Sequence, residues 1–251
     1  MEAADAHAER NQQTFAELVR DETEFFRWQS EKVALIESVL RGLRPHGSLA
    51  DVGCFTGLAT AIFRATGFER AVGFDSCQEA LDLAETRNIQ PRVWSVDSGT
   101  CPAADSEFHV VVAADIIEHI VDTDAFLREL WRILDLDGFL IVTTPNLAFW
   151  ISRLRLLAGK PPWSYPGPSS TVKGDLMVDL NHIRITTRRE WEALFRVRSF
   201  EIVDVRGWSI LQAKGDSIGV RIRRLIDRYA TGFPDFACGL LFVLRKVKSV
   251  E

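Results

Sequence analysis

Apolar and polar positions follow two different periods along this chain of 251 residues. Between residues 47 and 145, short apolar runs alternate with stretches whose apolar residues recur at helical spacing. The runs are SLADVG, RAVGFD, PRVWSVD, FHVVVAAD and GFLIVTTP, and the helical stretches include 57–66, 77–87 and 122–134. Such an alternation predicts a parallel sheet built from βα units.

The two flanks of this region have different patterns. Residues 14–43 have apolar positions at helical spacing and end at RPHG, so we expect an N-terminal helical cap over residues 1–46. In the segment 147–181, the amphipathic LAFWISRLRLLAGK precedes PPWSYPGPSSTVKGD, which is rich in proline and glycine. A long loop inside a compact domain is usually a lid or a binding loop, so we interpret 147–181 as a lid insertion in a domain spanning 47–251.

The C-terminal part predicts further elements of the same domain. TTRREWEALFRV is expected to form a helix, with Thr187 as N-cap and Glu190 completing a capping box. FEIVDVRGW and FACGLLFVLRKV are expected to be strands, and SIGVRIRRLIDRYA between them a basic amphipathic helix.

Composition excludes several classes of protein. The net charge of -5 argues against a general nucleic-acid binder, because affinity for phosphates needs a basic surface. The four cysteines lie far apart without a CxxC pair, which predicts reduced thiols in a cytoplasmic protein. The polar start lacks the apolar core of a secretory signal, and no apolar run reaches the ~18 residues of a membrane span.

The stretch LADVGCFTGLAT, residues 49–60, resembles a glycine-rich cofactor loop in which Gly53 and Gly57 frame a turn. A dinucleotide fingerprint that begins at Gly53 also needs glycines at the positions of Phe55 and Leu58. Asp51 would repel a pyrophosphate but attract a cationic amino-acid group. S-adenosylmethionine has such a group, an α-ammonium, together with a sulfonium and no phosphate.

Two more acids lie at the expected ends of the next strands. Asp75 closes VGFD, where a carboxylate can accept hydrogen bonds from both ribose hydroxyls, which suits NAD as well as S-adenosylmethionine. Asp97 closes VWSVD, within reach of an adenine amino group. Acids at the ends of three successive strands, the first joined to a glycine turn, favour a site for S-adenosylmethionine.

Four stretches also resemble those of a known family. They are DVGCFTG, VGFDSCQEALDLA, ADIIEHIVDTDAFLRELWRILDLDGFLIVTTPN and NHIRITTRREWEALF. With them the chain resembles the class I S-adenosylmethionine-dependent methyltransferases over about residues 25 to 246. Within this family it is similar to the branch of the ubiquinone-biosynthesis O-methyltransferases and of bacterial glycan and natural-product enzymes. It departs from that pattern at Phe55, at Asp137, and at Ser199 with Phe200.

The resemblance implies an α/β fold, a Rossmann-like doubly wound seven-stranded sheet that is mainly parallel with an antiparallel last strand. It implies that Asp51 orients the methionine ammonium, that Asp75 holds the ribose, and that 114–116 face the sulfonium. Phe55 is expected to turn its ring away from the cofactor. The cofactor-binding residues implied are Asp51, Gly53, Cys54, Phe55, Gly57, Asp75, Ser76, Asp97, Ser98 and Asp115.

Candidates for acting on the methyl acceptor lie just after the fourth strand and beyond the insertion. If a helix follows that strand, Asp115, Glu118 and His119 share one face by their spacing. We expect catalytic roles for His119, His182 and Asp115, with one histidine as the general base of an O-methylation. The alternative is that His119 only packs near the cofactor and that His182 only satisfies a backbone carbonyl.

A divalent metal is a further alternative that the resemblance suggests. In some relatives a carboxylate-x-x-Glu-His motif and a later histidine gather such an ion, and Asp115, Glu118, His119 and His182 supply the same types of ligand. Because Asp115 is shorter than glutamate, the set can be one ligand short. We therefore predict no metal site.

The expected function is O-methylation of a small molecule or a glycan, without nucleic-acid partners and without a transmembrane segment. Trp150, Trp163 and Tyr165 in the insertion are candidates for stacking on the substrate. Arginines of the insertion and of the late basic helix suit a phosphate-bearing substrate or a peripheral membrane contact. Two alternatives are an N-methyltransferase of an amino sugar or peptide amine, and a non-catalytic cofactor-binding domain.

Overall fold

The computed structural model describes residues 22–97, 99–162, 182–209 and 217–248. Their contacts group the chain into two compact units, which divide between Ser95 and Val96. The division of the chain into a helical cap over 1–46 and a domain with a lid over 147–181 stays a prediction. Much of the lid falls outside the described residues.

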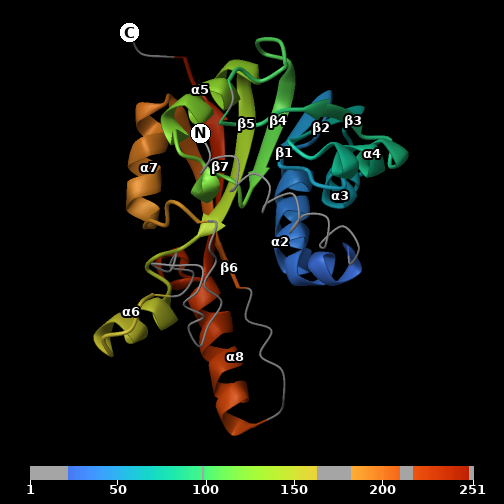
Figure 1. Ribbon diagram of the computed structural model, residues 1–251. Helices are drawn as coiled ribbons and strands as arrows, with labels where there is room; N and C mark the ends of the chain where they lie inside the picture. Colours follow the sequence, from blue (N-terminus) through green and yellow to red (C-terminus); the bar gives the residue numbers. More distant parts are fainter. Residues whose placement is uncertain (1–21, 98, 163–181, 210–216, 249–251) are drawn as a thin grey trace, which may run out of the picture. The chain divides into compact units, whose positions relative to one another are not determined.

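Seven strands form one sheet in the order β3-β2-β1-β4-β5-β7-β6 (Figure 1). Within the first unit β1 pairs parallel with β2, and β2 with β3. Within the second unit β4 pairs parallel with β5, whereas β7 pairs antiparallel with both β5 and β6. The predicted Rossmann-like, mainly parallel sheet with an antiparallel last strand is thus confirmed.

The first unit alternates helices and strands as the sequence pattern predicts. Strands β1 and β2 are buried along almost their whole length and are mostly apolar, as expected of strands that are covered on both faces. Helix α3 packs on β2, α4 packs on β2 and β3, and α2 packs on α3. Its elements are α2 (Glu22–Gly42), β1 (Ser48–Val52), α3 (Leu58–Arg64), β2 (Arg70–Asp75), α4 (Gln78–Thr86) and β3 (Gln90–Val93).

The second unit contains the longer strands. Helix α5 packs on β5, α7 packs on β6, and α8 contacts β6 and η2. The predicted capping box of α7 is present, since the Glu190 carboxylate accepts the Thr187 backbone N–H at 3.0 Å. Its elements are β4 (Phe108–Ala114), η1 (Ile117–His119), α5 (Thr123–Ile133), β5 (Leu134–Pro145), α6 (Trp150–Leu157), α7 (Arg188–Val197), β6 (Phe200–Trp208), α8 (Ile218–Thr231), η2 (Pro234–Phe236) and β7 (Gly239–Lys246).

Two predicted boundaries near the site need correction. Strand β3 ends at Val93, and the next residue, Trp94, buries its ring edge-on against Phe74, with ring centres 6.0 Å apart. Asp97 therefore follows the strand in a turn and does not lie at its tip. After β4 the backbone turns at Asp115, which has a φ of 51°, and only the three-residue 3₁₀ helix η1 follows.

Gly57 opens α3 and offers a test of close packing in the first unit. Its φ is 73°, and an added Cβ would lie 2.8 Å from the Cβ of Ala84 on α4. Gly57→Ala combines backbone strain with overpacking, so we expect the free energy of unfolding to fall by roughly 2–4 kcal/mol in urea titrations. Gly159→Ala is the matched control, because Gly159 has a φ of 67° but no atom within 4 Å of such a Cβ. If both variants lost the same free energy of unfolding, packing of Gly57 against Ala84 would be excluded as a cause.

Candidate active site

The glycine loop after β1 is fixed to β2 through backbone hydrogen bonds. The N–H groups of Gly53 and Cys54 donate to the carbonyl of Phe74 at 2.8 and 3.1 Å. A tight turn then closes, with the Gly57 N–H donating to the Cys54 carbonyl at 2.9 Å. Gly53, Phe55 and Gly57 all have φ between 52° and 76°, so the loop uses the left-handed region three times. Only two of the three positions have the glycine that this region favours.

Members of the loop face different surroundings. Gly53 is exposed, which leaves its backbone open to the close approach of a ligand. Cys54 is buried, and its Sγ lies 2.6 Å from where a Cβ on Gly73 would stand, so its thiol packs on the sheet. Gly57 packs on Ala84. The structure thus places Gly53 at the surface of the loop, and gives Gly57 and the Cys54 thiol packing contacts in the first unit.

Asp51 is a buried carboxylate at the end of β1. Its side chain is 4 % exposed and accepts a hydrogen bond from Thr60 Oγ1 at 2.5 Å. Burial raises the pKa of Asp51 to about 7, against the lowering effect of the Thr60 bond. The charge of Asp75 raises this pKa further, and that of Lys32 lowers it. A carboxylate in this setting gains most from a ligand with positive charge.

Asp75 joins the end of β2 to the glycine loop. One carboxylate oxygen accepts the Phe55 N–H at 2.9 Å, and the other accepts the Cys77 N–H at 3.0 Å. Burial raises the pKa of Asp75, and these backbone donors lower it. Ser76, the next residue, is exposed. Asp75 therefore holds Phe55 in its left-handed conformation through the hydrogen bond to its N–H.

The other predicted cofactor residues lie in the second unit. Asp97 accepts the Val121 N–H at 3.3 Å, which ties the turn after β3 to the segment before α5. Asp115 is held against β5, because Thr143 Oγ1 donates to its carboxylate at 2.6 Å. Ser98 falls outside the described residues. The expected helix face shared by Asp115, Glu118 and His119 is not formed, since Asp115 precedes the short η1.

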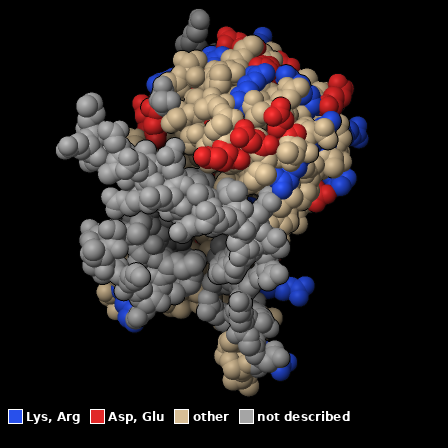
Figure 2. Space-filling view, turned by 45° about the vertical axis from the view of Figure 1, so that its right-hand side comes forward, with Lys and Arg blue, Asp and Glu red and all other residues tan. Residues whose placement is uncertain are grey.

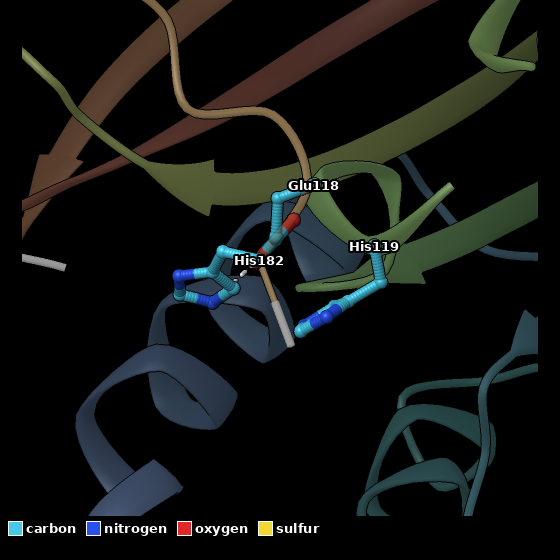
Figure 3. A group of neighbouring side chains, drawn as sticks. All are labelled: Glu118, His119 and His182. Carbon is cyan, nitrogen blue, oxygen red and sulfur yellow. Dashed lines mark ion pairs between the residues drawn. The ribbon is translucent and has the colours of Figure 1, made fainter. Parts of the chain in front are cut away.

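Glu118, His119 and His182 converge beyond the end of β4 (Figure 3). Glu118 is fully buried, His182 is buried, and His119 is half-buried. The rings of the two histidines have centres 4.8 Å apart, and His182 Nε2 lies 3.9 Å from Glu118 Oε1. One ligand-type atom from each residue lies within 4.8 Å of the others. The structure thus brings both predicted histidines together and leaves Asp115 outside their group.

Backbone hydrogen bonds fix the distant His182 beside η1. The N–H groups of Ile183 and Arg184 both donate to the Glu118 carbonyl, at 2.8 and 3.0 Å. The Arg184 guanidinium also donates to Thr123 Oγ1 at the start of α5, at 2.7 Å. These contacts join the segment before α7 to the segment after β4, so the position of His182 does not depend on its own side chain alone.

The comparisons with known proteins agree with this arrangement of strands. A family model for a methyltransferase domain matches residues 25–205 of the chain. The chain belongs to the S-adenosylmethionine-dependent methyltransferases. A solved complex between the Haloferax volcanii Trm112 methyltransferase activator and a methyltransferase contains a similar fold. That likeness has a TM-score of 0.65 at 15% identity and covers 94% of this chain and 96% of the other.

Two relatives of this methyltransferase show how far the sequence likeness extends. The human mitochondrial ubiquinone biosynthesis O-methyltransferase is 30% identical over 107 residues, which are 39% of this chain and 28% of the human protein. The uncharacterized methyltransferase YcgJ of Bacillus subtilis is 24% identical over 206 residues, 78% of this chain and 72% of its own length. The alignment with the human enzyme thus covers less than a third of that enzyme.

Several contacts of this methyltransferase's site escape prediction from sequence. Thr60 and Thr143 donate to Asp51 and Asp115, and although both lie within the quoted stretches, the sequence predicts a role for neither of them. Trp150, a candidate for stacking on the substrate, begins α6, and its indole N–H donates to Asp227 Oδ1 at 3.1 Å. Trp163 and Tyr165 lie outside the described residues. A buried acid in a basic helix is the one signal that could have pointed to the Trp150 contact.

Proposed function

We propose that this methyltransferase transfers a methyl group to a hydroxyl of a small molecule or a glycan. The observation that supports this proposal is the pair of imidazoles of His119 and His182 beside the buried carboxylate of Glu118. A neutral hydroxyl is a weak nucleophile, so its methylation needs a group that removes the proton. An imidazole titrates near neutral pH and suits this role.

The residues of the first unit fit S-adenosylmethionine, the cofactor that the family implies. Asp51 would attract the α-ammonium, the exposed backbone of Gly53 would lie against the methionine part, and Asp75 would accept the ribose hydroxyls. In the second unit Asp97 would contact the adenine. When bound, the cofactor supplies a methyl group activated on a sulfonium. The protein's share is then alignment of the acceptor and removal of its proton.

His119 and His182 would divide the handling of that proton between them. His119 is the more exposed of the two, so it is our candidate for contact with the acceptor hydroxyl. His182 neighbours both the His119 imidazole and the Glu118 carboxylate, and a negative charge on that carboxylate would stabilise a protonated ring.

We also propose that the protein is cytoplasmic, which is supported by its four cysteines, since they form no disulfide.

The same three side chains are also a ligand set for a divalent metal. Two imidazoles and a carboxylate suit Zn²⁺ or Mn²⁺, and the three ligand-type atoms lie within 4.8 Å of one another. Glu118, His119 and His182 would then hold an ion whose Lewis acidity favours loss of the acceptor's proton. In this alternative the histidines bind the metal ion, and the reaction is still an O-methylation.

Matched acceptors separate these accounts. We expect the purified chain to methylate hydroxyl compounds of a panel of phenols, catechols and sugars, each paired with its amine analogue, as detected by the mass gain of one methyl group. Methylation of the amines alone would overturn the O-methyl proposal, and calorimetric binding of the cofactor without any transfer would support a non-catalytic domain. The reaction is repeated after chelation. Loss of activity that Mn²⁺ or Zn²⁺ restores would assign the histidines to a metal.

A further inference from the structure

Helix α8 presents a continuous apolar stripe to solvent. Ile218, Ile222, Leu225 and Tyr229 are 80 %, 54 %, 71 % and 72 % exposed. Their spacing of four, three and four residues places them on one face of the helix. An apolar stripe at this spacing normally faces a core, so its exposure over the length of α8 calls for a partner.

The opposite face of α8 holds the helix on the protein. Asp227 and Ala230 are buried, and they lie on the side of the helix away from the stripe. Asp227 accepts hydrogen bonds from the Trp150 indole of α6 and from the Ser209 hydroxyl beyond β6. A polar anchor thus fixes α8 in an orientation that turns its apolar side outward.

The neighbouring α6 and η2 extend this apolar surface. Leu154, Leu156 and Leu157 of α6 are exposed as well. A hollow of about 300 Å³ adjoins the stripe at Tyr229. Its lining consists of Trp150, Ile226, Tyr229, Ala230, Phe233 and Phe236. Apolar side chains therefore surround the hollow on three elements of the second unit.

The charges of α6 and α8 are almost entirely positive. Their sequences contain arginines at 153, 155, 221, 223, 224 and 228, and their one acid is the buried Asp227. Arg221 and Arg228 are exposed beside the stripe. Among the described residues, those that show at the lower end of Figure 2, the level at which α8 lies in Figure 1, are blue and tan. A second copy of the chain would set arginine against arginine, whereas an anionic surface matches this charge.

We propose that α6 and α8 form a docking surface for an anionic lipid bilayer. The leucine and isoleucine side chains enter the boundary between headgroups and acyl chains, and the exposed Arg221 and Arg228 bind lipid phosphates. Tyr229 lies at the level of the headgroups, as amphipathic rings do at membrane interfaces. None of the described helices combines the length and hydropathy that crossing a membrane requires. The contact is therefore peripheral, and it is independent of the proposed methyl transfer.

Vesicle co-sedimentation of the full chain tests this surface. We expect binding to vesicles of phosphatidylcholine mixed with phosphatidylglycerol, weaker binding to phosphatidylcholine alone, and loss of binding as salt is raised. Leu225→Asp should weaken binding at least about tenfold. Arg221→Gln combined with Arg228→Gln should weaken it roughly fivefold per arginine. Val197→Asp is the matched control, since Val197 ends α7 and is 70 % exposed, and this variant should bind like the wild type.

Three results would overturn the proposal. The first is vesicle binding that does not depend on phosphatidylglycerol. The second is binding that is unchanged in the α8 variants, and the third is a loss of binding in Val197→Asp equal to that in Leu225→Asp. Sedimentation velocity tests the alternative that a second copy of the chain covers the stripe. If the wild type forms an oligomer that Leu225→Asp dissociates, and the wild type does not bind vesicles, the stripe is a self-association surface. Circular dichroism and calorimetric binding of S-adenosylmethionine establish that each variant is folded. No readout involves methyl transfer, so failure here leaves the proposed reaction untouched.

Discussion

Turnover of a hydroxyl acceptor should fall by roughly 10²–10⁴-fold when His119 or His182 is replaced by alanine. The reason is that each replacement removes an imidazole from the group that is proposed to take the acceptor's proton. Because the two rings lie 4.8 Å apart and serve one proton transfer, their losses should not add, and the double variant should be little slower than either single one. Initial rates at saturating cofactor measure the effect.

Two measurements make this result specific. His109→Ala is the matched control, because His109 lies on β4, the strand that precedes η1, and pairs with Asp135 outside the group. It should keep wild-type turnover. Calorimetry should show that the His119 and His182 variants bind S-adenosylmethionine as the wild type does. If both variants then keep near wild-type rates, the proton-transfer account fails and an amine acceptor becomes the better hypothesis.

The sequence predicts the parts of this molecule that depend on periodicity. The βα alternation gave the order of elements, and strand ends placed Asp51 and Asp75 correctly, because a parallel sheet aligns the carboxyl ends of its strands. His182 lies far along the chain from His119, and only the resemblance to a family suggested that they meet. Backbone hydrogen bonds from Ile183 and Arg184 to Glu118 bring them together, and such bonds cannot be predicted from a local sequence pattern.

Other features could not be predicted, because they depend on backbone conformations that non-glycine residues seldom adopt. Asp115 has a φ of 51°, which ends β4 abruptly and turns its carboxylate to Thr143. Phe55 has a φ of 52°, held by the bond from its N–H to Asp75. That its ring turns away from the cofactor stays a prediction. In both cases the conformation follows from a tertiary hydrogen bond, which side-chain propensity does not encode.

Asp51→Asn should change how both stability and cofactor binding depend on pH. Burial is the main reason why the pKa of Asp51 is raised to about 7 in the folded chain, from an ordinary 3.8. Between these two values the folded state holds a proton that the unfolded state has lost. The free energy of unfolding therefore falls as pH rises through this window, by about 1.4 kcal/mol per pH unit from this one group. Asparagine cannot ionise, so the variant should lack this part of the slope in urea titrations at pH 5 and 7.

Cofactor binding should follow the opposite trend in pH, because a ligand with an ammonium group binds the ionised carboxylate. The affinity for S-adenosylmethionine should rise roughly tenfold per unit as pH approaches 7 from below, and should level off above it. In Asp51→Asn the affinity should be weaker and nearly constant over this range. Asp82→Asn, an exposed change on α4, should behave as the wild type does. Calorimetric titrations from pH 5 to 8 decide the matter, since an unchanged pH dependence in Asp51→Asn would mean that another group meets the ammonium.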